Sequence, residues 1–394
     1  MIIAAEYHDR LARLKEKLRQ RQVDSLVVSA EDSIYYLTGV SYKPLERPFF
    51  MIVRAAAEPV LLVPALEQDH LRAAPNVSEV RHYWDYPSPP GEGWPERLQD
   101  LLAGAGRVAV EPTLPLEIYS WLRDLDPETL PLVEELRVVK CAAEVQKLRR
   151  AAYYADYTVE RIFRASYHGV SELELFSQGR SVQLQIMKHD GYEALTTNVL
   201  AASWPAPLSA QPHGVPAVDD RLGDGPHIAL GFVRVNGYAA ECERTYFLAP
   251  PTAQVREAFA AMQEARRRAY ALIRPGTPCT EVDLAAKRFL QDEGFGPYLL
   301  HRTGHGFGLG NHEAPWVAEG STEILAENML ISVEPGIYLP GVGGIRHSDT
   351  TLVTRNGYEN LTRFPSDLES MTLLGRKPLQ RMQGALVRRA VGMR

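Results

Sequence analysis

The stretch HRTGHGFGLGNHEAP, residues 301–315, carries His301, His305 and His312 at spacings of four and seven, with four glycines among them. Glycine permits sharp turns and a close approach of the backbone to a ligand, and binding residues concentrate in segments of this kind. A single histidine is usually structural, but three within twelve residues of a Gly-rich segment favour a functional role. We therefore predict that these histidines converge on a cleft.

Two other stretches add carboxylates that strands would carry toward such a cleft. MLISVEPG (329–336) places Glu334 at the end of an apolar strand, where a carboxylate is costly to bury unless it is paired, protonated or bound to a metal. NGYAAECERTYF (236–247) places Glu241 and Glu243 at alternate positions, so a strand would turn both toward one face. The alternative is a solvated strand face, which the apolar neighbours disfavour.

The chain of 394 residues is too long for one ordinary core and predicts two domains. Helical and strand-like runs alternate to about residue 135, which predicts an α/β domain over 1–138. A long amphipathic helix over 142–165 and a strand-rich remainder predict an α+β domain over 139–376. Residues 377–394 carry five basic and no acidic residues, and we expect a solvated basic tail.

The composition narrows the class of partner. A formal net charge of −6 argues against nucleic-acid and anionic-membrane partners, and no apolar run approaches the ~18 residues that span a bilayer. The N-terminus has no basic segment followed by an apolar one, so no secretion signal is expected. Three widely spaced cysteines fit a reducing compartment. We expect a cytoplasmic enzyme with a small-molecule or dipeptide substrate.

The order of the motifs resembles the creatinase, aminopeptidase P and prolidase family (peptidase family M24), whose catalytic domain has the pita-bread fold. GY-x-x-[DE]-x-x-RT is followed by H-x-x-GHG-x-G-x-x-x-HE-x-P, then by EPG-x-Y and GG-x-R, and VVKCAAEVQKLRRAA (138–152) joins the two domains. Several motifs in the right order are more specific than any one of them. The resemblance covers the whole chain and implies a hydrolase, a pita-bread C-terminal domain and a homodimer.

The peptidases of this family hold two divalent metal ions with five ligands: Asp, Asp, His, Glu and Glu. Aligned on the GY motif, the five corresponding positions here are Leu230, Glu241, His305, Glu334 and Ser348. Leucine has no lone pair to donate, and a serine hydroxyl is a poor ligand for a hard cation. We therefore expect no metal cofactor; if a single divalent metal is bound, its ligands are Glu241, His305 and Glu334.

Creatinase works without metal, and this chain is similar to it in the ERT at 243–245 and the LERPF at 45–49. The resemblance implies four catalytic groups, namely His213, His305, His312 and Glu334. It also implies five substrate-binding groups, namely Arg47, Glu241, Glu243, His301 and Arg346. For Arg47, a surface arginine fixed by the following Pro48 is an equal alternative.

The leading prediction is therefore metal-independent hydrolysis of a C–N bond in a small zwitterionic substrate, such as a guanidino or amidine acid. His213 would be the general acid/base, since an imidazole titrates near neutral pH. One alternative is an Xaa-Pro dipeptidase or aminopeptidase with a mononuclear or altered metal site, which the peptidase-like HEAP at 312–315 favours. Another alternative is a catalytically inactive family member that acts as a binding protein.

Overall fold

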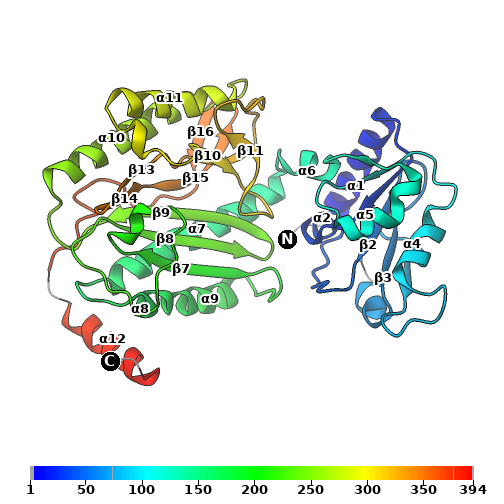
Figure 1. Cartoon of the computed structure of the whole chain (residues 1–394), viewed down its shortest axis with the longest axis horizontal. Helices are drawn as coiled ribbons and strands as arrows, with labels where there is room; N and C mark the ends of the chain where they lie inside the picture. The colour runs from blue at the N-terminus through cyan, green and yellow to red at the C-terminus, as the bar shows by residue number, and fades with distance from the viewer. Residues whose placement is uncertain (1–3, 73, 376, 393–394) are drawn as a thin grey trace. The chain divides into compact units, whose positions relative to one another are not determined.

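The computed structural model describes residues 4–72, 74–375 and 377–392, which form two compact units, Met1–Arg137 and Val138–Arg394 (Figure 1). The expected fold class, an α/β N-terminal domain followed by an α+β pita-bread domain, is confirmed. No helix in the described ranges combines the length and the apolar content needed to cross a membrane.

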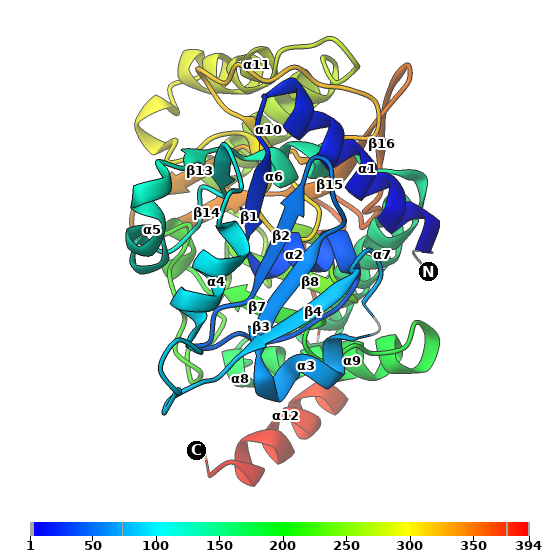
Figure 2. The same ribbon diagram turned by 90° about the vertical axis from the view of Figure 1, so that its right-hand side faces the viewer.

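The first unit is built on a six-stranded sheet in the order β4-β3-β2-β1-β5-β6. Figure 2 shows β1 to β4 side by side. The strands are β1 Ser25–Val28, β2 Phe50–Arg54, β3 Val60–Pro64, β4 Glu79–Tyr83, β5 Val108–Val110 and β6 Glu128–Thr129. The helices are α1 Ala4–Gln20, α2 Glu31–Thr38, α3 Gln68–Leu71, α4 Trp94–Leu102, α5 Leu116–Leu122 and α6 Leu132–Arg137.

Apolar periodicity explains how the helices of this unit pack. The stripe of Leu11, Leu14 and Leu18 on α1 is buried, as expected for an amphipathic helix at the edge of a core. Side chains of α4 and α5 pack with those of the strands in one apolar cluster. Helix α2 ends at Gly39, whose φ of 71° is the left-handed conformation that glycine adopts without strain.

The second unit is built on an eight-stranded sheet, with seven strands in the order β11-β10-β12-β15-β9-β8-β7 and β16 paired with β15. These strands are β7 Asn198–Trp204, β8 His227–Val235, β9 Tyr238–Tyr246, β10 Gly304–Gly306, β11 Glu313–Val317, β12 Leu330–Ser332, β15 Ser348–Thr354 and β16 Gly357–Asn360. A separate hairpin consists of β13 Gly336–Leu339 and β14 Gly343–Arg346. The helices are α7 Ala142–Ala165, α8 Glu172–Phe176, α9 Gln178–His189, α10 Ala253–Tyr270, α11 Cys279–Asp292 and α12 Pro378–Ala390.

The long helix α7 packs on β8 and β9, the strands that carry much of the site (Figure 1). Its N-terminus is stabilised by Glu144, whose carboxylate accepts a hydrogen bond from the backbone N–H of Cys141 at 3.0 Å. On β8, a Cβ at Gly231 would lie 2.4 Å from the carbonyl oxygen of Ala155. Glycine at this position therefore lets α7 approach the sheet closely.

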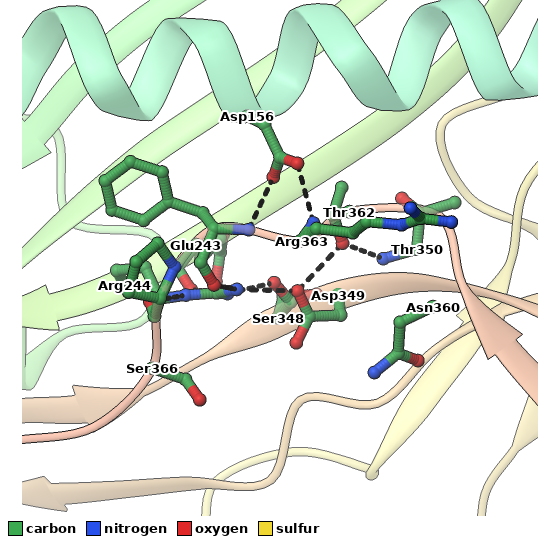
Figure 3. A network of polar contacts seen from close by, with 12 residues as sticks. Asp156, Glu243, Arg244, Ser348, Asp349, Thr350, Asn360, Thr362, Arg363 and Ser366 are labelled. Carbon is green, nitrogen blue, oxygen red and sulfur yellow. Dashed lines mark hydrogen bonds and ion pairs between the residues drawn. The ribbon is translucent and has the colours of Figure 1, made fainter.

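A buried polar network fixes β9 against β15 (Figure 3). Asp349 accepts hydrogen bonds from Arg244 at 2.7 Å and from Thr362 at 2.8 Å, and it also pairs with Arg266. Burial alone would raise the pKa of Asp349, but the two guanidinium groups hold it below its usual range. Asp349 thus stays ionised and fixes the register that places Ser348 opposite Glu243.

The basic C-terminal tail differs from the solvated end that its charge suggested. Residues 378–390 form helix α12, and Gly384 on this helix is buried. A Cβ at this glycine would collide with the carboxylate of Glu174 and the hydroxyl of Tyr167. Arg388 donates to Glu174 at 2.6 Å. The helix therefore docks through polar contacts, for which apolar periodicity gives no signal.

Candidate active site

Strands of the large sheet bring most of the predicted site residues together in the second unit. Glu241 and Glu243 lie on β9, His305 lies on β10, and Glu334 lies two residues after the end of β12. The exposed fractions of Glu241 and His305 are only 2% and 1%. The prediction that apolar strands carry buried carboxylates to the Gly-rich histidine segment is thus met in the geometry.

The two glycines beside His305 are needed for that approach. A Cβ at Gly304 would lie 2.1 Å from the carbonyl oxygen of Ser332, and one at Gly306 would lie 2.3 Å from that of Ala314. Both distances are far below van der Waals contact, so a larger residue would push β10 away from its neighbours. The GHG sequence is therefore what allows an imidazole to lie deep between β11 and β12.

His305 is the centre of the cluster. Its Nε2 lies 3.1 Å from a carboxylate oxygen of Glu334 and 3.8 Å from one of Glu241, while its Nδ1 donates to the carbonyl of Gly306 at 3.1 Å. Burial would lower the pKa of His305, but the hydrogen bond to Glu334 and the charge of Glu241 raise it to about 9. Burial and the charge of Glu334 raise the pKa of Glu241 to about 8. One imidazole is thus shared between two buried acids.

Glu243 and Arg346, both predicted to bind substrate, are instead paired with each other. Arg346 donates to both carboxylate oxygens of Glu243, with Nη2 to Oε1 at 2.8 Å, and its Nη1 donates to the hydroxyl of Tyr338 at 2.9 Å. That hydroxyl also lies 2.7 Å from Nε2 of His301. The carboxylate and the guanidinium are buried and neutralise each other, which leaves neither charge free for a ligand.

Leu230 and Ser348 occupy the two positions at which the family's peptidases have metal-binding carboxylates. Leu230 lies opposite Glu243 in the register of β8 and β9 and is 6% exposed. Ser348 donates through Oγ to Glu241 at 2.6 Å. A second cation beside the first would therefore meet a hydrocarbon side chain, a hydroxyl and the guanidinium of Arg346, and the residues present do not fit a metal pair.

A single divalent cation does fit the residues present. Ligand atoms of Glu241, His305 and His312 all lie within 4.8 Å of one another, and Glu334 is hydrogen-bonded to His305 in the same cluster. Carboxylate oxygens and an imidazole nitrogen at these separations are a plausible ligand set for zinc or manganese. The structure thus places His312 beside the ligand candidates that the sequence supplied.

Two further predicted histidines lie on the open side of the cluster. The ring of His312 lies 3.8 Å from that of His305 and is partly exposed. Partial burial and the charge of His305 lower the pKa of His312 to about 4, with smaller contributions from Arg302 and His213. His213 lies in the exposed segment between β7 and β8.

Arg47 belongs to the first unit. It pairs with Asp85 and, at 2.7 Å, with Glu46. The structure thus gives its charge local partners, in keeping with the alternative of an arginine fixed at the surface.

Sequence reasoning missed two supporting groups. Tyr338 links His301 to Arg346, and its place in EPG-x-Y was the available signal. Buried Lys140 donates to Glu313 at 3.1 Å beside His312, and its signal was the VVKC join.

Comparison with known proteins follows the same division of the chain. The model of metallopeptidase family M24 matches residues 146–355, and that of the creatinase/prolidase N-terminal domain matches residues 10–150. An uncharacterized peptidase of Staphylococcus aureus (strain USA300) is 29% identical over 356 residues, which cover 90% of this chain and 99% of the relative.

Solved structures agree over nearly the whole length. The dipeptidase PepE from Mycobacterium ulcerans has a TM-score of 0.81 and 29% identity, with 95% of this chain and 100% of that chain covered. An Xaa-Pro dipeptidase from Bacillus anthracis has a TM-score of 0.77 and 25% identity, with 93% and 100% covered. These relatives support the peptidase alternative better than the leading prediction of a creatinase-like substrate.

The family model spans 210 of the 394 residues and includes every motif of the second unit. The resemblance inferred from those motifs is therefore confirmed. The chain belongs to metallopeptidase family M24, with a creatinase/prolidase N-terminal domain, and is a hydrolase of the creatinase/Xaa-Pro peptidase type.

Proposed function

We propose that this chain is a dipeptidase that cleaves an Xaa-Pro bond with the help of one divalent cation. The observation that carries the proposal is the cluster of Glu241, His305 and Glu334, in which one imidazole nitrogen faces two buried carboxylates. Carboxylate and imidazole groups of this number leave coordination positions free for water and substrate. The names of the similar structures, a dipeptidase and an Xaa-Pro dipeptidase, support the substrate class.

Glu241, His305 and Glu334 would hold the cation. When bound, such a cation supplies Lewis-acid polarisation of a carbonyl group. The hydrogen bond from Nδ1 of His305 to the carbonyl of Gly306 fixes the ring so that Nε2 faces the two carboxylates. The backbone N–H of His305 in turn donates to Oγ of Ser332 at 2.9 Å, which holds β10 in place.

We assign proton transfer to His312 and His213. Because the pKa of His312 is lowered to about 4, its imidazole is neutral at pH 7 and has a lone pair that accepts a proton. His213, on the exposed side, is assigned the delivery of a proton to the leaving nitrogen. The buried pair of Glu243 and Arg346 holds the wall of the site and takes no part in proton transfer.

The test is hydrolysis of alanyl-proline by the purified full-length chain, before and after a chelator and after added Mn²⁺, Co²⁺ or Zn²⁺. We expect cleavage to be lost in the chelator and restored by the added ion. The variant His305→Ala should stay inactive with every ion, while Arg355→Met, at an exposed turn, serves as the control. Cleavage that continues undiminished in the chelator would overturn the proposal.

A second candidate is supported by the arrangement of charges. The His305–Glu334 pair is complete without a cation, and Leu230 and Ser348 remove two ligands of a metal pair. Both features suit metal-independent cleavage of a C–N bond in a guanidino or amidine acid, with His213 as the general acid/base. This candidate requires activity on such acids in the presence of a chelator, and loss of that activity in His213→Ala.

A cytoplasmic location and a homodimer belong with this proposal as predictions. The first rests on the widely spaced cysteines and the second on the family resemblance. Light scattering from the purified chain tests the homodimer, which requires a mass of about twice 44.0 kDa.

A further inference from the structure

Cations are sparse along the wall of the site that runs from β10 to β14. Residues 303–345 contain neither lysine nor arginine, and Arg302 and Arg346 lie at the two ends of this stretch. Arg346 is 6% exposed and is fully engaged by Glu243. Arg302 is therefore the arginine at this wall that remains for a negatively charged ligand.

Arg302 is exposed and held in a defined place without an acidic partner. Its Nε donates to the carbonyl of Gly304 at 3.1 Å, and its guanidinium carbon lies 4.6 Å from the ring centre of Trp316. No carboxylate of the described residues lies within ion-pair distance of this guanidinium. Stacking on an indole orients a guanidinium while it leaves the outer N–H groups free to donate.

Trp316 connects this arginine to the site. Trp316 on β11 is the cross-strand partner of His305 on β10, and directly opposed residues of antiparallel strands turn their side chains to the same face. Trp316 is 38% exposed, which is unusual for a large aromatic residue beside a buried histidine. The indole and the stacked guanidinium thus form an accessible surface on the face that His305 occupies.

Arg302 also lies close to the strand that carries His305, since the carbonyl to which it donates belongs to Gly304 on β10. A carboxylate bound to the guanidinium of Arg302 would therefore lie beside β10 and Trp316.

We propose that Arg302, stacked on Trp316, binds the C-terminal carboxylate of the substrate and so selects peptides that end shortly after the scissile bond. This inference rests on the proposed peptidase function. It gives the binding of the substrate carboxylate to a residue of the catalytic unit rather than to Arg47, which the family resemblance implied as a substrate-binding group. Arginine suits the task because its planar N–H pairs match a carboxylate in two parallel hydrogen bonds.

The test compares alanyl-proline with alanyl-prolinamide, which differ only in the terminal carboxylate. In Arg302→Met, methionine keeps the apolar contact with Trp316 but loses the charge. We expect the ratio of kcat/KM for the acid over the amide to fall about 10- to 100-fold, mostly through KM, since a hydrogen bond to a charged group is of that size. Arg302→Lys should recover part of the ratio, and the matched control Arg355→Met should leave it unchanged.

An unchanged ratio in Arg302→Met would overturn the inference, whether the activity on both substrates is kept or falls equally. If the wild-type chain cleaves neither substrate, the proposed function fails, and calorimetric titration with uncleaved alanyl-proline then decides the role of Arg302. Binding by the wild type that weakens at least about 10-fold in Arg302→Met would support the carboxylate contact. Equal binding by both proteins, or no binding by the wild type, would contradict it.

Discussion

Two neighbouring groups of side chains in the site differ in how their charges are balanced. The histidine half, formed by Glu241, His305 and Glu334, holds two carboxylates against one imidazole. The arginine half, formed by Leu230, Glu243, Arg346 and Ser348, pairs one carboxylate with one guanidinium in two hydrogen bonds. The histidine half therefore has one carboxyl group, that of Glu241, beyond the one paired with the imidazole, whereas in the arginine half one carboxylate and one guanidinium neutralise each other.

This difference accounts for the change at each ligand position. With leucine at 230, a carboxylate that family peptidases use is absent beside Arg346, and Glu243 on the neighbouring strand supplies the negative charge that this buried guanidinium needs. At position 348, the serine hydroxyl donates a hydrogen bond to Glu241. A carboxylate at this position would instead repel the carboxylate of Glu241. The site thus lacks two carboxylates of a metal pair, pairs Arg346 with Glu243, and keeps Glu241, His305 and Glu334 together.

The largest expected effect is the loss of His305. In His305→Ala the two carboxylates lose the nitrogen between them, and we expect kcat/KM on alanyl-proline to fall by about 1000-fold or more, roughly 4 kcal/mol. Steady-state kinetics together with metal analysis of the purified variant check this result. A variant that keeps both its activity and its metal would contradict the assignment of the cation to the histidine half.

The next expected effect is a loss of stability when the ion pair of the arginine half is broken. Arg346→Met leaves the buried carboxylate of Glu243 without a partner, and we expect a loss of roughly 3–5 kcal/mol in the free energy of unfolding. Replacing both groups, in Arg346→Met/Glu243→Met, should recover most of that loss because no charge is left unpaired. Urea denaturation measures both variants; a double variant as unstable as the single one would show that the pair is not self-contained.

Glu172 shows how a buried acid behaves in this unit without a cation. It accepts the backbone N–H of Ser203 at 2.9 Å, and burial raises its pKa to about 8. An acid with a raised pKa stays protonated in the folded state while the unfolded state ionises, so its contribution lowers stability as pH rises from about 4.5 to about 8.

We therefore expect the wild-type chain to lose a few kcal/mol more over this range than Glu172→Gln, which cannot ionise. Denaturation of both proteins at several pH values gives the difference directly, and other titrating groups cancel in it. Parallel pH profiles for the two proteins would show that Glu172 is ionised in the fold.

The smallest effect concerns the boundary between the halves. Ser348→Ala removes the hydrogen bond to Glu241, and we expect a change of about 1 kcal/mol, or a several-fold loss in kcat/KM with the fold intact. Kinetics of this variant beside Ser332→Ala, which removes the hydroxyl that donates to Glu334, show how each carboxylate depends on its support. A loss as large as that of His305→Ala would mean that Ser348 is itself part of the reacting group.

Local sequence patterns predicted that the residues of the histidine half meet, but they predicted the contacts of the arginine half only in part. Glycines on both sides of His305 and an acid at the end of an apolar strand are local signals, and they predicted residues that do meet. The bond between Glu243 and Arg346 depends on how β9 lies beside β14 and β15, which no local pattern encodes.

Outside the site, too, local patterns predicted elements, whereas contacts between distant parts of the sequence were not predicted. Alternating helical and strand-like runs predicted the α/β character of the first unit. The docking of α12 depends on the missing side chain of Gly384 and on Glu174, more than two hundred residues earlier in the sequence. Stacking of Arg302 on Trp316 likewise requires the pairing of β10 with β11.

The number of divalent cations bound per chain tests the account most directly. We would titrate the metal-free, full-length protein with Mn²⁺ and with Zn²⁺ by calorimetry and analyse the dialysed protein for metal. One ion per chain, lost in His305→Ala and kept in Ser348→Ala, is the predicted result. Two ions per chain would contradict the assignment of the arginine half, and no bound ion would contradict the proposed peptidase and favour the metal-independent hydrolase.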